Sequence, residues 1–211
     1  MEGFADRAEA GRALAEALTH LPDEGVVVLA IPRGGAEVAA EVSRLRGWPL
    51  DVVIPRKVGA PGNPELGLGA IAPGVRVLDE DLVRRLGVSE EYLDAESGAQ
   101  EAEIRRRSNT YRRGRPPPEL DGKVAVVVDD GVATGGTAAA SIRWARAQGA
   151  ARVIFAVPVG PRESIVRLSK EADETVCLMT PERFFAVGQW YRDFPQTPDE
   201  RVVEALEQAA R

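Results

Sequence analysis

The sequence has little of the chemistry that supports disulfides or histidine-rich metal sites. Its 211 residues include one cysteine, Cys177, and one histidine, His20, so an internal disulfide and a histidine-rich metal centre are both excluded. Cys177 lies in a strand-like apolar stretch, where we expect a small core residue. His20 follows the first predicted helix, near its C-terminal carbonyls. We therefore expect both residues to be structural.

Long apolar runs and excess positive charge are also missing. No uninterrupted apolar run reaches membrane-spanning length, and the first residues lack the basic start and apolar block of a secretory signal. The formal net charge of −6 argues against a protein whose main role is non-specific nucleic-acid binding. We expect a cytoplasmic protein with neither a membrane nor a nucleic acid as its partner.

Apolar runs alternate with amphipathic helical patterns along the chain. Runs with apolar residues on both faces predict strands, and their alternation with helices indicates an α/β fold with a parallel sheet covered on both sides. The length suits one domain. Strands are expected at 26–31, 50–54, 123–128, 152–159 and 174–179, and helices at about 6–19, 36–46, 137–148 and 161–171.

Three segments depart from this alternation. Residues 55–75 are rich in glycine and proline and predict a long irregular segment. Residues 79–113 are charged and helical in pattern, and predict a helical insert within a core of residues 1–179. Arginines of this insert alternate with acidic residues, so a solvated helix face is favoured over a nucleic-acid patch. Residues 180–211 concentrate aromatic side chains and predict a small C-terminal hood followed by a final helix.

The stretch VVVDDGVATGGT, residues 126–137, has the pattern of a ligand site. A buried-looking strand ends in Asp129 and Asp130, and ligands of open parallel sheets gather at such strand ends. The following glycines, threonines and helix start are suited to a phosphate. Two carboxylates would repel that phosphate unless they bind sugar hydroxyls or Mg²⁺. The stretch therefore indicates a phosphorylated ribose together with a metal.

Two other phosphate motifs fit less well. The spacing of the glycines matches a Walker A loop, but Gly136 is followed directly by Thr137, without the lysine that contacts the γ-phosphate. The string GLGAIA at 67–72 imitates a dinucleotide-binding pattern, but it follows no predicted strand, and Pro73 stands where a helix would have to continue. A glycine-rich strand–helix turn without a ligand is the remaining structural alternative.

The motif resembles the signature of the type I phosphoribosyltransferases, and the order of elements from about 26 to 179 agrees with their fold. The resemblance implies that Asp129 and Asp130 bind the 2′ and 3′ hydroxyls of 5-phosphoribosyl 1-pyrophosphate (PRPP). Mg²⁺ would be bound mainly through PRPP, with no metal ligands from the protein. The residues implied around the 5′-phosphate are Ala133, Thr134, Gly135, Gly136 and Thr137.

The resemblance extends to two more loops. The loop after the first sheet strand corresponds to the family's pyrophosphate loop, although a surface ion pair is an alternative for its arginine. Residues 55–75 correspond to the family's mobile loop, which closes over the substrate and brings positive charge to the pyrophosphate. The residues implied in these two loops are Arg33, Gly34, Gly35, Arg56 and Lys57.

The activity implied is the Mg²⁺-dependent transfer of a 5-phosphoribosyl group from PRPP to a small nitrogenous acceptor, a nucleobase, with release of pyrophosphate. Ala133 stands where the hypoxanthine/guanine enzymes carry an aspartate, which weakens a 6-oxopurine assignment, whereas ATGGT looks like the adenine enzymes. A PRPP sensor without transfer activity is the alternative; Arg33 and Lys57 favour turnover.

The acceptor is expected at the hood, where aromatic side chains either stack on a flat ring or fill a core. The helical insert is expected to shape the acceptor pocket or to form a contact in a homodimer, and the sequence does not choose between these roles. The candidate stacking residues are Phe184, Phe185, Trp190 and Tyr191.

Overall fold

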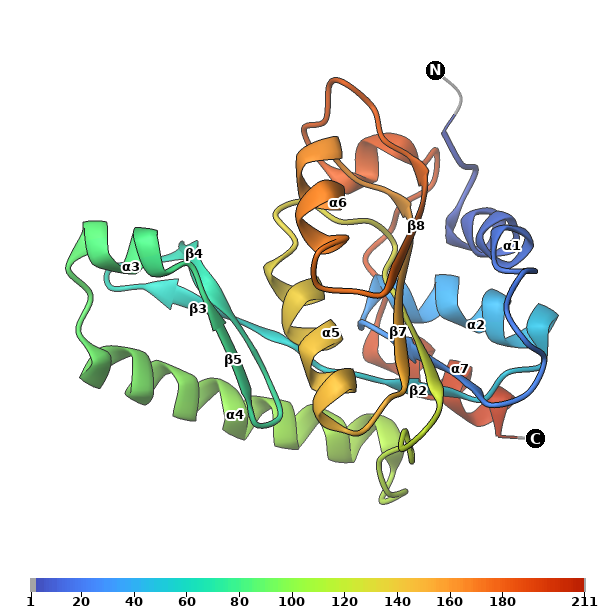
Figure 1. Cartoon of the computed structure of the whole chain (residues 1–211), viewed down its shortest axis with the longest axis horizontal. Helices are drawn as coiled ribbons and strands as arrows, with labels where there is room; N and C mark the ends of the chain where they lie inside the picture. The colour runs from blue at the N-terminus through green and yellow to red at the C-terminus, as the bar shows by residue number, and fades with distance from the viewer. Residues whose placement is uncertain (1–2, 211) are drawn as a thin grey trace.

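The computed structural model describes residues 3–210 and is built around a five-stranded parallel sheet with the strand order β2-β1-β6-β7-β8. Figure 1 shows this sheet between two layers of helices, so the predicted α/β fold is confirmed. The strands are β1 (Val26–Ala30), β2 (Leu50–Val52), β6 (Val124–Val128), β7 (Arg152–Val159) and β8 (Glu174–Met179).

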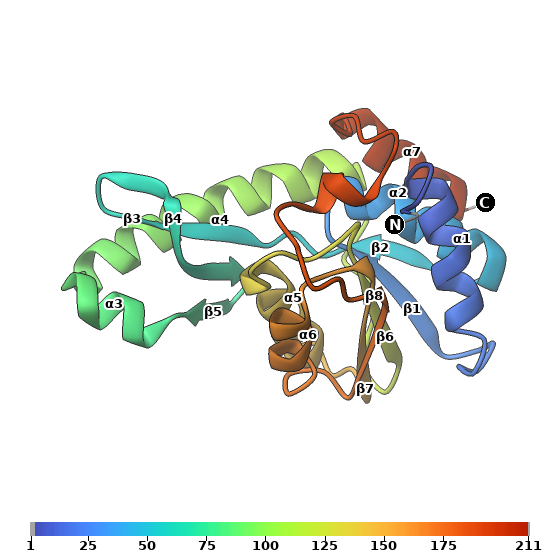
Figure 2. The same cartoon turned by 90° about the horizontal axis from the view of Figure 1, so that it is seen from above.

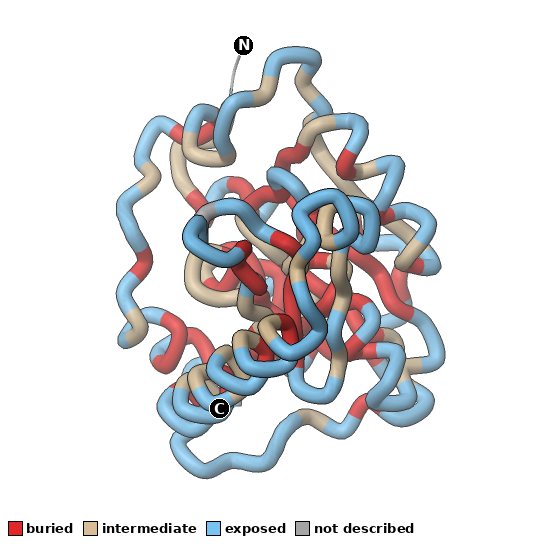
Figure 3. Tube along the Cα trace, turned by 90° about the vertical axis from the view of Figure 1, so that its left-hand side faces the viewer, coloured by how far each residue is buried: buried red, intermediate tan, exposed pale blue. Residues whose placement is uncertain are grey.

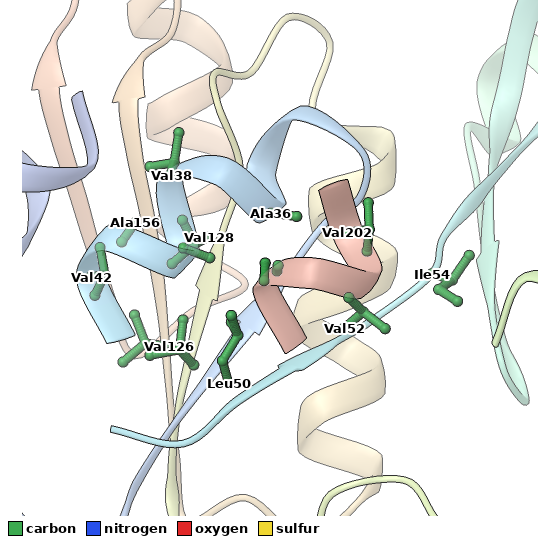
Figure 4. Packing of buried hydrophobic residues seen from close by; sticks show 14 of the residues in the cluster. Ala36, Val38, Val42, Leu50, Val52, Ile54, Val126, Val128, Ala156 and Val202 are labelled. Carbon is green, nitrogen blue, oxygen red and sulfur yellow. The ribbon is translucent and has the colours of Figure 1, made fainter. Parts of the chain in front are cut away.

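Alternate side chains of the strands enter two separate cores, because neighbouring residues of a strand point to opposite faces. Val126 and Val128 lie in a cluster with residues of the helices α1 and α2, and Val127 lies in the cluster that includes residues of α5. Figure 4 shows the first cluster, with Val38 and Val42 of α2 near Val126 and Val128. The helices on the two faces are α1 (Arg7–Ala17), α2 (Gly34–Arg46), α5 (Gly136–Ala147) and α6 (Arg162–Leu168).

Residues 56–112 form a projection that we call the arm, which extends from the sheet in Figures 1 and 2. Its strands form a separate antiparallel sheet in the order β3-β4-β5. The arm consists of β3 (Arg56–Ala60), β4 (Asn63–Ala72), β5 (Val75–Leu78), α3 (Glu80–Leu86) and α4 (Glu90–Arg112).

The irregular structure expected for 55–75 is wrong, because β3 and β4 occupy most of this segment. Val58 and Leu68 are buried in one cluster with Leu93 and Ile104 of α4, so tertiary packing stabilises the hairpin despite its glycines. The helical prediction for 79–113 is confirmed. Caps explain where its helices begin: Asp79 accepts from Leu82 N at 2.9 Å, and the Ser89 hydroxyl accepts from Tyr92 N at 3.2 Å.

Residues 180–210 divide into two parts that lie in different places. The hood, residues 180–198, contains the short helix η1 (Val187–Trp190) and pairs with the N-terminal segment through the bridge between Phe4 and Tyr191. The final helix, α7 (Asp199–Ala209), instead lies beside α2 and α4, and Figure 1 shows it far from the hood. Val202 of α7 is buried in the core cluster of Figure 4.

Burial concentrates at the central sheet, whereas the outer parts of the arm are largely exposed (Figure 3). Within residues 3–210, none of the helices has the length and apolarity needed to cross a membrane.

His20 bonds to the end of α1 through Ala17 O at 3.1 Å and to Glu174 at 2.7 Å. Cys177 packs against the second core cluster, and burial raises the pKa of its thiol to about 11. Both residues are therefore structural, as expected.

Candidate functional site

Two loops meet at the carboxyl end of the central sheet. Strands β1 and β6 are parallel neighbours, with Ala30 opposite Val128, so the segments that follow them emerge at the same edge. The segment after β1 carries Arg33, and the segment after β6 carries Asp129 and Asp130. Parallel pairing therefore brings together two motifs that lie almost a hundred residues apart in the sequence.

Glycines allow these two loops to approach closely. A Cβ atom placed on Gly34 would lie 1.9 Å from Asp130 Oδ2, which no side chain could tolerate without a shift. A Cβ on Gly35 would lie 2.9 Å from both the Asp129 Cα and the Val128 carbonyl oxygen, which are backbone atoms. The two glycines of PRGG are thus needed because α2 begins in direct contact with the acidic pair, where a side chain would clash.

Two residues hold Asp130 in place. The sequence did not point to Arg7, and it suggested a stacking role for Tyr191. Arg7 Nε donates to Asp130 Oδ2 at 2.8 Å, and Tyr191 donates its hydroxyl to the Asp130 carbonyl at 2.5 Å. Arg7 is the first residue of α1, and no motif in its surroundings distinguishes it from other helical arginines. Only its burial and its partner, 123 positions away, identify it.

The acidic pair lies in a poorly hydrated environment. Burial raises the pKa of Asp129 well above its usual range, and the neighbouring charge of Asp130 adds to that rise. Burial also raises the pKa of Asp130, whereas its hydrogen bond and charge interaction with Arg7 oppose the rise. A carboxylate pair of this kind gains from ligands that donate hydrogen bonds, such as the hydroxyls of a diol.

The predicted phosphate loop leads into the N-terminus of α5. Gly135 caps the helix in the left-handed region, with φ of 77°, and Thr134 is exposed. Ser164 of α6 donates to the Ala133 carbonyl at 2.6 Å, and Arg167 donates to the Thr134 carbonyl. These contacts bind the loop's carbonyl groups to α6. The N-terminus of α5 lies at the strand ends, where its backbone amides favour an anion.

Strand β4 lies directly beside this phosphate loop. A Cβ on Gly136 would have the Gly69 carbonyl carbon of β4 as its neighbour at 4.0 Å. Gly69 has φ of 159° and leaves no room for a side chain, because its Cβ would lie 2.1 Å from the Val77 carbonyl oxygen. The GLGAIA string therefore packs the arm against the phosphate loop and is not a dinucleotide motif.

The basic residues assigned to pyrophosphate have different surroundings. Arg33 Nη1 lies 3.8 Å from Asp199 Oδ1 of α7, and Tyr111 donates to the same oxygen at 2.7 Å. Arg56 Nε donates to Gln100 of α4 at 2.8 Å, which turns it toward the arm. Lys57 is exposed on β3. Arg33 therefore precedes Gly34 at the acidic pair, but its side chain lies beside Asp199 of α7. Arg56 and Lys57 belong to the arm.

The hood aromatics fill a core more than they offer a stacking surface. Trp190 and Tyr191 are 5% and 7% exposed and form a cluster with Phe4, Phe184 and Phe194 among others. Tyr191 and Phe194 stack with ring centroids 4.9 Å apart. Phe185 is the exception, with 85% of its surface exposed. Burial favours the core alternative for Trp190 and leaves Phe185 as the accessible ring of the hood.

A metal ion would find few ligands from the chain itself. Among residues 3–210 there is no group of three or more histidine, cysteine, aspartate or glutamate side chains arranged to hold one. The acidic pair supplies carboxylate oxygens, which suit Mg²⁺ only when further oxygens complete its coordination. Phosphate oxygens of a ligand at the neighbouring loops would supply them.

Comparison with known proteins identifies the family of this domain. The model of the phosphoribosyl transferase domain matches residues 5–192, which contain both loops and Arg7. A Mycobacterium tuberculosis protein (strain ATCC 25618 / H37Rv) named "Putative phosphoribosyl transferase" is 50% identical over 212 residues, covering 100% of this chain and 48% of its own length. The chain thus spans about half the length of the curated relatives it matches.

A solved structure gives the same fold. The crystal structure of TT1426 from Thermus thermophilus is 45% identical, covers 99% of each chain and has a TM-score of 0.84. A purine phosphoribosyltransferase from Pyrococcus horikoshii Ot3 is 21% identical over 85% of this chain and 91% of its own, with a TM-score of 0.47. The second likeness is too distant to assign an acceptor.

Proposed function

Because the chain belongs to the phosphoribosyl transferase domain family, we propose that it transfers the 5-phosphoribosyl group of PRPP to a nitrogen acceptor and releases pyrophosphate. The observation that carries this proposal is the close approach of Gly34 to Asp130, beside the N-terminus of α5. It places an acidic pair between two loops that are suited to phosphate groups. PRPP has the matching order of groups: pyrophosphate, diol and 5′-phosphate.

Each part of the donor then has a partner in the chain. Asp129 and Asp130 accept hydrogen bonds from the 2′ and 3′ hydroxyls, while the amides and hydroxyls of the phosphate loop bind the 5′-phosphate. Arg33 and the amides of Gly34 and Gly35 bind the pyrophosphate. The residues of the phosphate loop are Ala133, Thr134, Gly135, Gly136 and Thr137.

Mg²⁺ fits this site as an ion that arrives on the donor. The pyrophosphate oxygens and ribose hydroxyls would hold it beside Asp129 and Asp130, because the described part of the chain does not supply a full set of ligands. When bound, it neutralises negative charge on the departing pyrophosphate.

The reaction breaks the bond between the anomeric carbon and the pyrophosphate oxygen, and the electron pair leaves with pyrophosphate. A bond to the acceptor nitrogen forms on the opposite face with inversion, and the proton of the acceptor nitrogen passes to the released pyrophosphate. Since the old bond breaks well before the new one forms, the ribosyl centre becomes oxocarbenium-like. Arg33 and Lys57 stabilise the charge on the leaving group, and the acidic pair fixes the ring. For this role Lys57 must approach from the arm, which would also exclude water.

The acceptor is proposed to be a nucleobase that binds beside the acidic pair and against the exposed side of the hood. Phe185 is the hood aromatic with an exposed ring available for stacking. Ala133 cannot act as a base toward a purine, because its methyl side chain carries no titratable group. This supports an acceptor outside the 6-oxopurines.

Pyrophosphate release from PRPP and Mg²⁺, measured across purines, pyrimidines and simple amines, tests the proposal. Base-dependent release is expected for at least one acceptor, and Asp130→Asn should lose it while Arg12→Gln, an exposed change on α1, keeps it. Tight PRPP binding without release for any acceptor would instead favour a PRPP sensor. Failure to bind PRPP at all would contradict both functions.

A further inference from the structure

Arg7 is buried in a way that is unusual for an arginine. It is 5% exposed, and such a charge is tolerated in a protein interior only when it is paired and its donors are bonded. Its Nε donates to Asp130 Oδ2 at 2.8 Å, and its Nη1 donates to the Pro195 carbonyl at 2.8 Å. Its guanidinium carbon lies 3.8 Å from the centroid of the Phe194 ring.

These contacts connect three parts of the molecule through one side chain. Asp130 follows β6, Phe194 and Pro195 belong to the hood, and Glu37 of α2 lies 3.8 Å from Arg7 Nη1. The planar guanidinium allows this, because its donors point in fixed and different directions. A lysine ammonium is a compact point charge and lacks the planar fork that reaches these partners in fixed directions.

The pyrophosphate loop is shaped around the same pair. A Cβ on Gly34 would lie 1.9 Å from Asp130 Oδ2 and 2.9 Å from Arg7 Nε. The loop backbone therefore packs directly against the ion pair. Displacement of Arg7 would free Asp130 Oδ2 and so alter the orientation of this carboxylate.

The ion pair leaves the rest of the acidic pair available to a ligand. Asp130 uses Oδ2 for Arg7, and Asp129 Oδ1 accepts from the Asp130 amide at 2.9 Å. In the part of the chain that the structure describes, no amide, guanidinium or hydroxyl group donates to Asp130 Oδ1 or Asp129 Oδ2. One oxygen of each carboxylate is fixed by these bonds, and the two carboxyl groups also lie within hydrogen-bond reach of each other, so a diol would replace that contact.

We propose that Arg7 is a positioning residue that orients Asp130 toward the ribose diol of the donor and fastens the hood next to it. The inference rests on the proposed function, because the diol is that of PRPP. Arg7 itself does not touch the donor in this arrangement. Its effect on the donor passes through Asp130, while Phe194 and Pro195 are held by the same guanidinium.

The test compares a ligand that has the diol with one that lacks it. PRPP and inorganic pyrophosphate, each with Mg²⁺, are titrated calorimetrically into the wild type, Arg7→Gln, Arg7→Lys and the control Arg12→Gln. Arg7→Gln is expected to weaken PRPP binding at least tenfold and to leave pyrophosphate binding within twofold. Arg7→Lys should lie between Arg7→Gln and the wild type, and Arg12→Gln should match the wild type.

A double-mutant cycle with Asp130→Ala, which removes the acceptor of the Arg7 hydrogen bond, separates positioning from general damage. If Arg7 acts through Asp130, adding Arg7→Gln to Asp130→Ala should change PRPP affinity by less than twofold. A full additional loss in that background, or an equal loss for pyrophosphate, would overturn the positioning role. If Arg7→Gln does not fold, as judged by thermal melting, Arg7→Lys takes its place in the cycle, with an expected PRPP loss of at least threefold.

PRPP binding distinguishes a failure of the Arg7 role from a failure of the proposed function. A wild type that binds PRPP, together with an Arg7→Gln protein that binds it equally well, would contradict only the role of Arg7. A wild type that does not bind PRPP would contradict the proposed function and this inference together.

Discussion

The site at the strand ends and the arm use charged residues in opposite ways. Around the acidic pair, charges are buried and pair across the chain, as Arg7 does with Asp130 over 123 positions. Along α4, charges are exposed and pair with neighbours three or four positions away, as Glu103 does with Arg106 and Arg107. Charges of the first kind depend on tertiary packing, whereas those of the second kind stabilise a local helix. Substitutions should therefore have large effects on function at the site and small effects on stability in the arm.

Gly34→Ala should produce the largest effect, because the added Cβ would meet Asp130 Oδ2 at 1.9 Å. The carboxylate must move, and we expect PRPP binding to fall at least a hundredfold, about 2.7 kcal/mol.

The control is Gly98→Ala in α4, where no atom lies within 4 Å of the added Cβ. It should leave binding unchanged and stabilise the helix by about 0.5–1 kcal/mol. Calorimetric titration and thermal melting measure both, and normal PRPP affinity in Gly34→Ala would refute the close packing of the two loops.

Asp130→Asn should have the next largest effect. Asparagine keeps an oxygen for Arg7 but loses the charge that strengthens hydrogen bonds to the donor hydroxyls, so binding should weaken by about 1.5–3 kcal/mol. The expected change in the dissociation constant is about 10- to 150-fold. Circular dichroism should show an unchanged fold. A PRPP affinity equal to that of the wild type would remove Asp130 from the donor site.

Lys57→Ala should affect turnover more than donor binding. Lys57 is exposed on β3, and we expect it to contact the pyrophosphate only as the reaction proceeds. Loss of such a contact lowers kcat with little change in the affinity for PRPP. A tenfold or greater fall in kcat with less than a threefold change in PRPP affinity is expected, once an acceptor is known. Arg84→Ala on α3, whose side chain is 75% exposed, is the matched control in the arm. Equal losses in both parameters would place Lys57 in ground-state binding instead.

The sequence predicts the central sheet well because its signals are local. Valine-rich runs mark β1 and β6, and the acidic pair with its glycine loop is contiguous in the chain. The hairpin of β3 and β4 was missed because its glycines and prolines obscure the strand pattern, and burial of Val58 and Leu68 against α4 stabilises it. Arg7 and Asp199 were missed for a similar reason. Their partners, Asp130 and Tyr111, lie about ninety or more positions away, and nothing in the nearby sequence signals either contact.

Glu103→Gln in the arm should produce the smallest effect and the clearest contrast with the site. Arg106 and Arg107 both donate to Glu103 at 2.7 Å, which lowers the pKa of this carboxyl from 4.5 to about 2. Because the folded pKa lies below the unfolded value, the pair stabilises the fold above about pH 4.5. This contribution is lost as the pH falls toward 2.

A solvent-screened helix pair of this kind adds little to stability, so Glu103→Gln should lower Tm at pH 7 by no more than about 2 °C. At pH 2 the variant and the wild type should melt at nearly the same temperature. Glu101→Gln is the control, because its carboxylate lies farther from its arginine, at 3.8 Å from Arg105. A loss of several kcal/mol from Glu103→Gln would mean that charges of the arm are coupled to the rest of the fold, as those of the site are. The contrast between the two regions would then no longer hold.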